Sequence, residues 1–560
     1  MIENLPNHLK KYVVDQNYDR YTPIDQATWR YILRQLKDFL SKNAHECYLE
    51  GLEKTGISSE EIPKISEMNT KLKNFGWQAV PVSGFIPPAA FMELQSLSLL
   101  PIASDMRSLD HLLYTPAPDI VHEAAGHAPI LVNTEYAAYL KAYAQVAKKS
   151  IISKDDLEIY EAIRNLSDIK ENSSSTKQEI KNCEQQLEFA LKKVTYISEA
   201  TLLSRMNWWT AEYGLVGPMS NPKLFGAGLL SSVGEAKWCL SNQVKKIPFT
   251  VDCIKQSYDI TEPQPQLYVT PDFKTLTTVL HEMSEKMSYK IGGAYGLEQA
   301  IKAQSVNTFE LDTGLQISGV ITNYEKNNVG EPIYVQTTGP TQISHRDRQI
   351  AGHSKDYHLH GYGCPVGSFE LTGTFENNQT IQMKYVSGIV VNGKVKKVLK
   401  ISESAQIITL TNASAKLADK VLFDSAWGDY DIAIGKKIVS VFGGPADRKE
   451  YGDTDDFVAA RVQQPKYSDQ QKNLFSLYQT VRDFRKSESS AEVLQKIFTQ
   501  CLETASDQWL LFIELLEICH YKNINTSLKT DILNQLEKLK NTQQQISPLI
   551  EDGLRLSTYA

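Results

Sequence analysis

The pattern of apolar and polar positions divides the chain into three parts. Up to about residue 300, apolar side chains recur with the helical period, and residues 27–40 predict one amphipathic helix. Short β-prone runs follow from about 305 to 445, and from about 467 the period is helical again. We therefore expect a multidomain protein with a mainly α-helical domain (1–300), a smaller all-β domain (301–450) and a C-terminal helical bundle (451–560).

Local signals refine this division. Residues 381–386 predict a strand, and 388–391 and 394–399 predict a hairpin across Asn392-Gly393, a dipeptide typical of two-residue turns. Prolines at 81 and at 87–88 predict a loop in the helical part. In the C-terminal part, successive apolar stripes predict three or four helices.

Residues 150–199 are more polar and predict a helical hairpin inserted into the first domain. The pattern indicates a short helix over 159–169 and a flexible or capping turn over 172–176. An apolar stripe that starts at Ile180 could run on as one long helix to Glu212. We favour a passive surface insertion over a lid or a partner-binding element.

Composition excludes several classes of protein. The chain has 560 residues, a net charge of -7 and 42% hydrophobic residues, which fits a soluble protein with no basic footprint for nucleic acid. It has no apolar run of membrane-spanning length and no signal peptide. Seven scattered cysteines without a C-x-x-C pair indicate reduced thiols. We expect a cytoplasmic protein that binds no nucleic acid and no membrane. Whether it forms a homo-oligomer is left open.

Candidate chemistry is concentrated in residues 119–127, which place His122 and His127 five positions apart. Glu212 adds a carboxylate inside an apolar segment further along. Two histidines and one carboxylate are the ligands of mononuclear iron(II) oxygenases, where they leave one face of the metal open for oxygen.

The spacing of the histidines distinguishes this pattern from a zinc metalloprotease, whose histidines lie at i and i+4. At i+5 the two side chains would be about 140° apart on an ideal helix. Both reach one metal only if the helix starts or distorts there, and Pro129 favours such a distortion. A metal-dependent hydrolase and a non-catalytic scaffold remain the alternatives from other classes.

Four sequence blocks together carry a resemblance to a known family. They are residues 81–86, 114–129, 209–215 followed by 225–235, and 262–269. In this order they resemble the pterin-dependent aromatic amino acid hydroxylases, most of all the phenylalanine 4-monooxygenases, over roughly residues 15–290. His127 and Glu212 lie further apart than is usual in that family, which fits the insertion. The resemblance starts so near the N-terminus that activation at an N-terminal regulatory site is not expected.

The resemblance implies an iron(II)- and tetrahydropterin-dependent monooxygenase. Such an enzyme uses O2 to hydroxylate the ring of a free aromatic amino acid, here most simply phenylalanine to give tyrosine. Tryptophan or another aromatic amino acid is the alternative substrate. The catalytic domain would then have the fold of this family.

The same resemblance implies roles for individual residues. The iron ligands would be His122, His127 and Glu212. Arg107 would bind the substrate carboxylate through a bidentate pair. The other substrate contacts would be Thr115, Gly228 and Ser231 at the amino-acid end, and Pro118, Trp208 and Tyr213 around the ring.

For the pterin, the resemblance implies backbone contacts at Gly84 and Ile86 and a stacking ring at Phe91. Glu123 would accept hydrogen bonds from the pterin or position water near the metal, and it has a competing role in supporting a ligand histidine. Residues 87–90 read Pro-Pro-Ala-Ala where the animal pattern is more polar, which leaves the natural pterin open.

A second histidine group lies in the β-rich part. It comprises His345, His353, His358 and His360, with Asp347 and Asp356 among them. On a strand, His358 and His360 would point the same way. A metal site is one interpretation, and an exposed loop followed by a strand is the favoured one.

Overall fold

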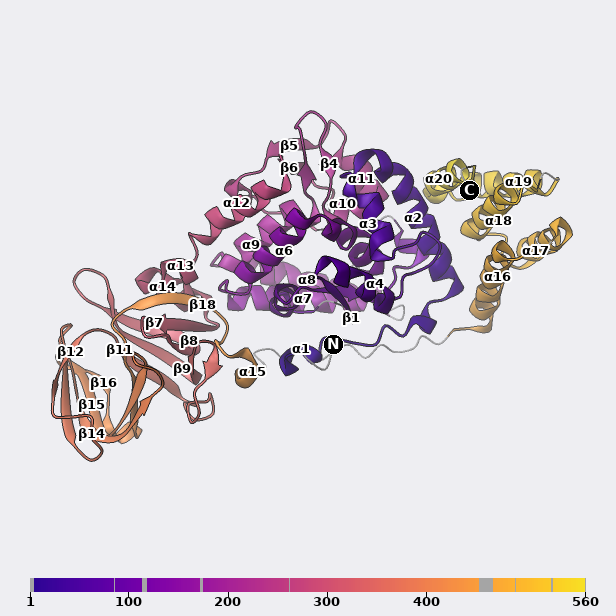
Figure 1. The fold of residues 1–560 in the computed structure, drawn as a ribbon. Coiled ribbons are helices and arrows are strands. Elements are labelled where there is room, and N and C mark those ends of the chain that lie inside the picture. The colour runs from indigo at the N-terminus through magenta and orange to yellow at the C-terminus, as the bar shows by residue number, and fades with distance from the viewer. Residues whose placement is uncertain are drawn as a thin grey trace.

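The computed structural model describes residues 5–84, 86–112, 118–171, 175–260, 262–452, 467–488, 490–524 and 527–558. A helical region lies between a β-rich region on one side and the C-terminal helices on the other (Figure 1). Thr115, one of the predicted substrate contacts, lies outside the described residues.

The described part of the helical region holds the first fourteen helices and six short strands. The helices are α1 Asn7–Lys10, α2 Pro23–Asn43, α3 Cys47–Thr55, α4 Ile65–Leu72, α5 Pro88–Ser96, α6 Thr134–Ala147, α7 Lys154–Glu171, α8 Lys177–Lys193, α9 Glu199–Asn207, α10 Ala227–Leu230, α11 Val233–Cys239, α12 Phe273–Ser284, α13 Ser288–Ile291 and α14 Gly293–Ala303. The strands are β1 Gln78–Val82, β2 Leu99–Ala103, β3 Leu215–Val216, β4 Lys223–Leu224, β5 Lys245–Pro248 and β6 Gln266–Thr270.

Short 3-10 and π segments connect these elements. They are η2 Tyr18–Arg20, η3 Lys73–Phe75, η4 Leu109–His111, η5 Val121–His127, η6 Pro129–Val132, η7 Trp208–Glu212 and η8 Val251–Lys255. The segments η5 and η7 are π-helices, and both carry predicted metal ligands.

The predicted helix over 27–40 is confirmed as the central part of α2. Thr22 caps this helix by accepting a hydrogen bond from the Asp25 backbone, and the Asp25 side chain caps the Thr22 backbone in return. The apolar face that the pattern predicts is buried in the main core. The prediction of a loop at Pro81 was wrong, because this residue lies within β1, which pairs in parallel with β2.

The insertion forms the predicted helical hairpin of α7 and α8. Thr176 caps α8 through a reciprocal pair with Glu179, as the predicted turn requires. The stripe does not run on as one helix to Glu212, because α8 ends at Lys193 and Ser198 caps a separate helix α9. The cap at Ser198 starts a new helix and so interrupts the predicted continuous one.

The β-rich region forms two antiparallel sheets, each of six strands. The first has the order β10-β9-β8-β7-β18 with β11 on β9, and the second has the order β12-β13-β14-β15-β16 with β17 on β15. The strands are β7 Val306–Leu311, β8 Leu315–Lys326, β9 Pro332–His345, β10 Arg348–Gln349, β11 Gly361–Pro365, β12 Phe369–Thr372, β13 Thr380–Tyr385, β14 Ile389–Lys400, β15 Gln406–Leu417, β16 Lys420–Phe423, β17 Tyr430–Ala433 and β18 Ile438–Gly443, with η9 Ser425–Trp427 before β17.

The predicted hairpin turn at Asn392-Gly393 was wrong. Both residues lie inside β14, which continues through them with a shift in register against β15. A Cβ on Gly393 would lie 3.0 Å from the Leu410 Cβ, so this glycine permits close packing between strands. The turn that precedes β14 is made at Gly388, whose φ is +91°.

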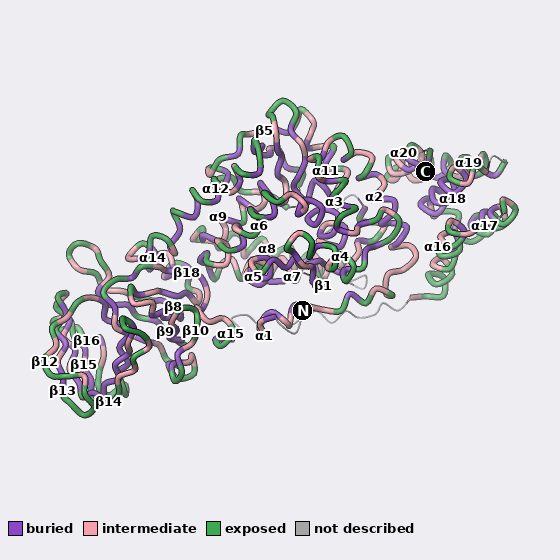
Figure 2. Tube along the Cα trace, in the orientation of Figure 1, coloured by how far each residue is buried: buried purple, intermediate pink, exposed green. Residues whose placement is uncertain are grey.

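Among the described residues, five helices follow the short α15 (Arg448–Tyr451), where three or four were predicted. They are α16 Asp469–Lys486, α17 Ala491–Thr504, α18 Trp509–Tyr521, α19 Ser527–Thr542 and α20 Ser547–Ser557, with η10 Gln544–Ile546 before the last. Almost the whole of α18 is buried (Figure 2). Its side chains belong to the same hydrophobic cluster as those of α2, so these helices extend the core of the helical region.

A buried ion cluster joins the C-terminal helices to α2. Arg30 of α2 donates to Glu514 and Glu517 of α18 at 2.6 and 2.8 Å, and Arg485 of α16 pairs with the same two carboxylates. Removing one partner from such a buried network costs about 3–5 kcal/mol. No helix in the described parts of the chain has both the length and the apolar character required to cross a membrane.

Candidate metal centre and active site

The two histidines that were predicted to bind a metal lie in a π-helix. Segment η5 spans Val121–His127, and its i→i+5 hydrogen bonding brings residues five apart onto one face. The ring centroids of His122 and His127 are 5.0 Å apart. The distortion that the spacing required is therefore present, and η6 begins directly after it at Pro129.

Glu212 reaches this face from a second π-helix, η7. Its carboxylate oxygens lie 3.2 Å from His122 Nε2 and 3.4 Å from His127 Nε2. Burial alone would raise the pKa of Glu212, but the two facing imidazoles hold that pKa well below its usual range. The structure thus brings all three predicted ligands together, and their ligand atoms lie within 4.8 Å of one another.

Glycines allow the segments around the metal centre to pack closely. A Cβ on Gly126 would lie 2.7 Å from the Ala227 carbonyl oxygen, and a Cβ on Gly228 would lie 2.9 Å from the Tyr213 ring. Both positions bring α10 against the ligand segments. For Gly228 this close packing is the observed role, and a contact with substrate stays a prediction.

Ser231 supports a ligand histidine. Its Oγ donates to the Ala227 carbonyl at 2.7 Å and lies 3.2 Å from His122 Nδ1. With its proton on Nδ1, the His122 ring would donate to Ser231 and leave Nε2 for a metal ion. Ser231 therefore orients His122 through the nitrogen that faces away from Glu212, whereas the predicted role was a substrate contact.

Glu123 is buried between charged neighbours. The pKa of its carboxyl group is raised to about 8, mainly by burial, while His127 lowers it and the carboxylates of Glu212 and Asp119 raise it. Its Oε2 atom has no hydrogen-bond partner among the described residues. An orphaned buried acceptor beside a metal centre fits a site that takes up a further ligand.

Arg107 is buried and forms a bidentate pair with Asp119. Its Nε and Nη2 atoms each donate to that carboxylate at 2.7 Å. Burial alone would raise the pKa of Asp119, but the Arg107 guanidinium holds it below its usual range. Asp119 therefore fixes the guanidinium, and binding of a substrate carboxylate by Arg107 stays a prediction.

Three aromatic rings stack beside Glu212. Trp208 lies 4.6 Å from Tyr213 and 4.2 Å from Tyr258, measured between ring centroids, and both pairs are stacked. Trp208 and Tyr213 were predicted to flank the ligand, whereas Tyr258 was missed because it follows η8 and belongs to none of the four blocks. Pro118, which was also predicted to contact the substrate ring, is half-buried and lies shortly before η5 in the chain.

Three of the four predicted pterin residues lie on one loop and the helix that follows it, and the fourth, Glu123, lies in η5. Gly84 has a φ of +59° and donates its backbone N–H to Asp105. Ile86 is buried, and Phe91 on α5 packs against the same small apolar cluster, which also contains Leu9 of α1. This places Ile86 and Phe91 in a common apolar surface next to β1.

The donor set fits a first-row transition metal ion. Two imidazoles and one carboxylate converge from two rigid segments, and one imidazole is held by Ser231. The side chains of His122 and Glu212 are 17% and 18% exposed, so the group is accessible from one side. This is the arrangement of a three-ligand face with open positions for cosubstrates.

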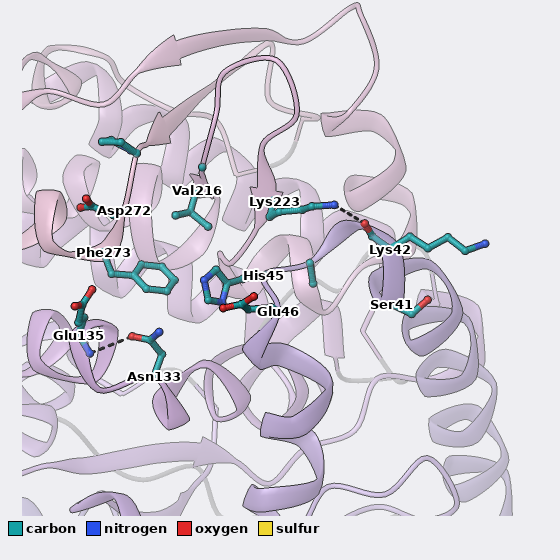
Figure 3. Close-up of a pocket in the computed structure, with 13 residues that line it drawn as sticks. Ser41, Lys42, His45, Glu46, Asn133, Glu135, Val216, Lys223, Asp272 and Phe273 are labelled. Carbon is teal, nitrogen blue, oxygen red and sulfur yellow. Dashed lines mark hydrogen bonds between the residues drawn. The ribbon is translucent and has the colours of Figure 1, made fainter.

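A separate pocket of about 540 Å³ lies at the end of α2 (Figure 3). His45, Asn133 and Phe273 line it, and Asn133 accepts a hydrogen bond from the Glu135 backbone as the cap of α6. Its lining residues include none of the predicted ligands or substrate contacts. Its polar groups serve local structure, so we place the active site at His122, His127 and Glu212.

Comparisons with known proteins show the family of the chain. The model of the family described as biopterin-dependent aromatic amino acid hydroxylase matches residues 10–162 and 178–323, just over half of the chain. The phenylalanine-4-hydroxylase of Mesorhizobium japonicum is 28% identical over 269 residues, 47% of this chain and 81% of that protein. The enzyme of the same name from Pseudomonas aeruginosa is 28% identical over 271 residues, which are 48% of this chain and 86% of that protein.

Among solved structures, phenylalanine hydroxylase from Chromobacterium violaceum with bound iron(III) and 7,8-dihydrobiopterin is 25% identical. It covers 49% of this chain and 85% of its own, with a TM-score of 0.39. The extent of the family match decides the assignment: the chain belongs to the biopterin-dependent aromatic amino acid hydroxylases.

Proposed function

We propose that this protein hydroxylates free phenylalanine to tyrosine with iron(II), a tetrahydropterin and O2. The observation that carries the proposal is the convergence of His122, His127 and Glu212 from two π-helices. Phenylalanine is the proposed substrate because the two relatives described above are named phenylalanine-4-hydroxylases. Tryptophan or another aromatic amino acid remains the second candidate.

The ligand face would hold iron(II), and the iron and the reduced pterin would together activate oxygen. The protein would orient the reactants in a pocket from which water is excluded. Arg107, fixed by Asp119, would bind the substrate carboxylate, and Trp208 and Tyr213 would contact the substrate ring. Ser231 would act as a positioning residue for His122.

The remaining contacts of the two cosubstrates are part of the same proposal. Thr115, Pro118 and Gly228 would border the amino acid. Gly84 and Ile86 would contact the pterin edge, and Phe91 would stack on its ring. Glu123, whose free acceptor atom is buried near the ligands, would hydrogen-bond to the pterin or to a water molecule at the metal.

The proposed catalytic domain is residues 1–300 with an insertion at 150–199, followed by regions 301–450 and 451–560. The family model omits residues 163–177, around the connection between α7 and α8, which supports an insertion there. Seven free thiols suit a reducing cytosol, and so does ferrous iron, so the cytoplasm is the proposed compartment.

The experiment is aerobic turnover of phenylalanine by iron(II)-loaded protein with a tetrahydropterin, measured by tyrosine fluorescence. His122→Ala is the test variant, and His281→Ala, which removes an exposed imidazole on α12, is its matched control. We expect tyrosine from the wild type and from His281→Ala, and none from His122→Ala.

Other outcomes would change the proposal in defined ways. Product from tryptophan and not from phenylalanine would change the substrate and leave the class intact. Peptide hydrolysis restored by zinc(II), without oxygen uptake, would overturn the oxygenase assignment and revive the hydrolase alternative.

A further inference from the structure

A second group of ligand-type side chains lies in the β-rich region. It comprises His353 and His358, between β10 and β11, and Asp431 on β17. All three are buried, at 5%, 9% and 4% exposure, and one ligand atom from each lies within 4.8 Å of the others. Of the predicted histidine group, His358 is buried at an isolated bridge and His360 is exposed in a turn, so the two do not share a strand face.

We propose that His353, His358 and Asp431 bind a divalent transition-metal ion, with zinc(II) the best match, which crosslinks the two sheets of the β-rich region. This site is independent of the proposed active site. The β-rich region lies to one side of the helical region that holds His122, His127 and Glu212 (Figure 1).

The spacing of the two imidazoles fits a shared metal ion. His353 Nδ1 and His358 Nε2 are 3.1 Å apart. Two nitrogen ligands bound tetrahedrally to zinc at 2.0–2.1 Å are about 3.3 Å apart. The proposed iron ligands give an internal comparison, since their nitrogen-to-oxygen separations are 3.2 and 3.4 Å. The two imidazole nitrogens of the second group are separated by a similar distance, and the ligand atom of Asp431 lies within 4.8 Å of both.

The carboxylate of Asp431 supplies the charge that such a site requires. It accepts a hydrogen bond of 2.5 Å from Thr409 Oγ1 and also interacts with the Tyr357 hydroxyl. Both contacts are neutral donors, and among the described residues no lysine or arginine forms an ion pair with this carboxylate. A buried carboxylate is costly without a cation, and a metal ion would provide one.

The backbone around the two histidines is fixed on β9. The His353 carbonyl accepts a hydrogen bond from the Ile343 N–H, and the His358 carbonyl accepts one from the Thr341 N–H, each at 3.0 Å. The Tyr362 ring packs edge-on against His358. The ligand side chains thus sit on a supported segment, as preorganised metal sites require.

The position of the group indicates what the ion would do. His353 and His358 belong to a segment that pairs with β9 of the first sheet, and Asp431 belongs to β17, which pairs with β15 of the second. The Tyr362 hydroxyl already accepts a hydrogen bond from the Ala433 N–H at 2.9 Å across this junction. An ion there would hold the sheets together, and its binding free energy would add to the stability of the fold.

The test is the metal content of full-length protein. The protein is stripped with a chelator, dialysed against zinc(II), and assayed by mass spectrometry. We expect two ions per chain in the wild type, one at each group. The double variant His122→Ala/His127→Ala should keep one ion, and adding His358→Ala should remove it. His360→Ala, which deletes an exposed neighbouring imidazole, is the matched control and should keep two.

A spectroscopic measurement covers the case in which His358→Ala does not fold. In the His122→Ala/His127→Ala background, cobalt(II) should give visible absorption of a tetrahedral site, and the conservative Asp431→Asn should shift it. A folded double variant that binds neither zinc(II) nor cobalt(II) would overturn the proposal and leave a simple imidazole–imidazole hydrogen bond. An unshifted spectrum in Asp431→Asn would contradict the role of Asp431.

Discussion

The helical and the β-rich regions each contain two histidines five residues apart and one acidic residue far along the chain. In the helical region, π-helix η5 brings His122 and His127 onto one face. In the β-rich region, His353 and His358 have the same spacing on a turn-rich segment beside β9. Two different backbone conformations therefore bring histidines of the same spacing together. In both groups the carboxylate comes from another element.

The two groups differ in accessibility, and this difference separates their proposed roles. His122 and Glu212 are partly exposed and lie beside stacked aromatic rings and a buried arginine. His353, His358 and Asp431 are all buried. A site that keeps open positions suits catalysis, whereas a buried one suits structural support. The predictions below test that contrast.

The largest expected effect is the loss of a ligand in the helical region. Glu212→Gln should lower the rate of tyrosine formation by more than about 100-fold, the upper limit for residues that only support a ligand. The thermal midpoint of the β-rich region should not change. Steady-state turnover measures the rate, and calorimetry on the same preparation measures the thermal midpoint. Normal turnover in Glu212→Gln would place the catalytic metal elsewhere.

The next effect is the removal of the second ion. In the His122→Ala/His127→Ala background, chelation should destabilise the protein by about 3 kcal/mol relative to zinc at roughly a hundred times its dissociation constant. Adding His358→Ala should abolish this response to chelator. Thermal unfolding with and without chelator measures it. An equal response in both variants would mean that the stabilising ion binds at another place.

A smaller effect is expected where Ser231 orients His122. Ser231→Ala should lower iron affinity or turnover by about 10–100-fold, because the ring loses the partner of its Nδ1 atom. Ser231→Thr keeps the hydroxyl group and is the control. A change in KM for phenylalanine alone would instead favour the substrate contact that the sequence predicted.

The smallest effects concern two glycines beside the histidine pairs. Gly126→Ala should cost about 1–3 kcal/mol, because its Cβ would lie 2.7 Å from the Ala227 carbonyl oxygen. Gly352→Ala has open space around it but a φ of +86°, so it should cost about 1 kcal/mol. Denaturant unfolding compares them, and an equal or reversed order would contradict the packing argument.

The sequence alone was enough to identify local features. Periodicity predicted the central part of α2, and the change from helical to β-prone runs came close to β7. The ligand triad of His122, His127 and Glu212 could be named because its residues stand in short segments that resemble a family. Each of these signals lies within a few residues of the position it predicts.

Only the tertiary structure decided how distant segments meet. It made Asn392-Gly393 part of a continuous strand against Leu410, and it placed α18 against Arg30 of α2. It also selected Asp431 as the neighbour of His353 and His358, where the sequence had offered Asp347 and Asp356. These outcomes depend on contacts between residues far apart in the chain, and no local pattern of hydrophobic and polar positions encodes which distant side chain will be delivered to a given site.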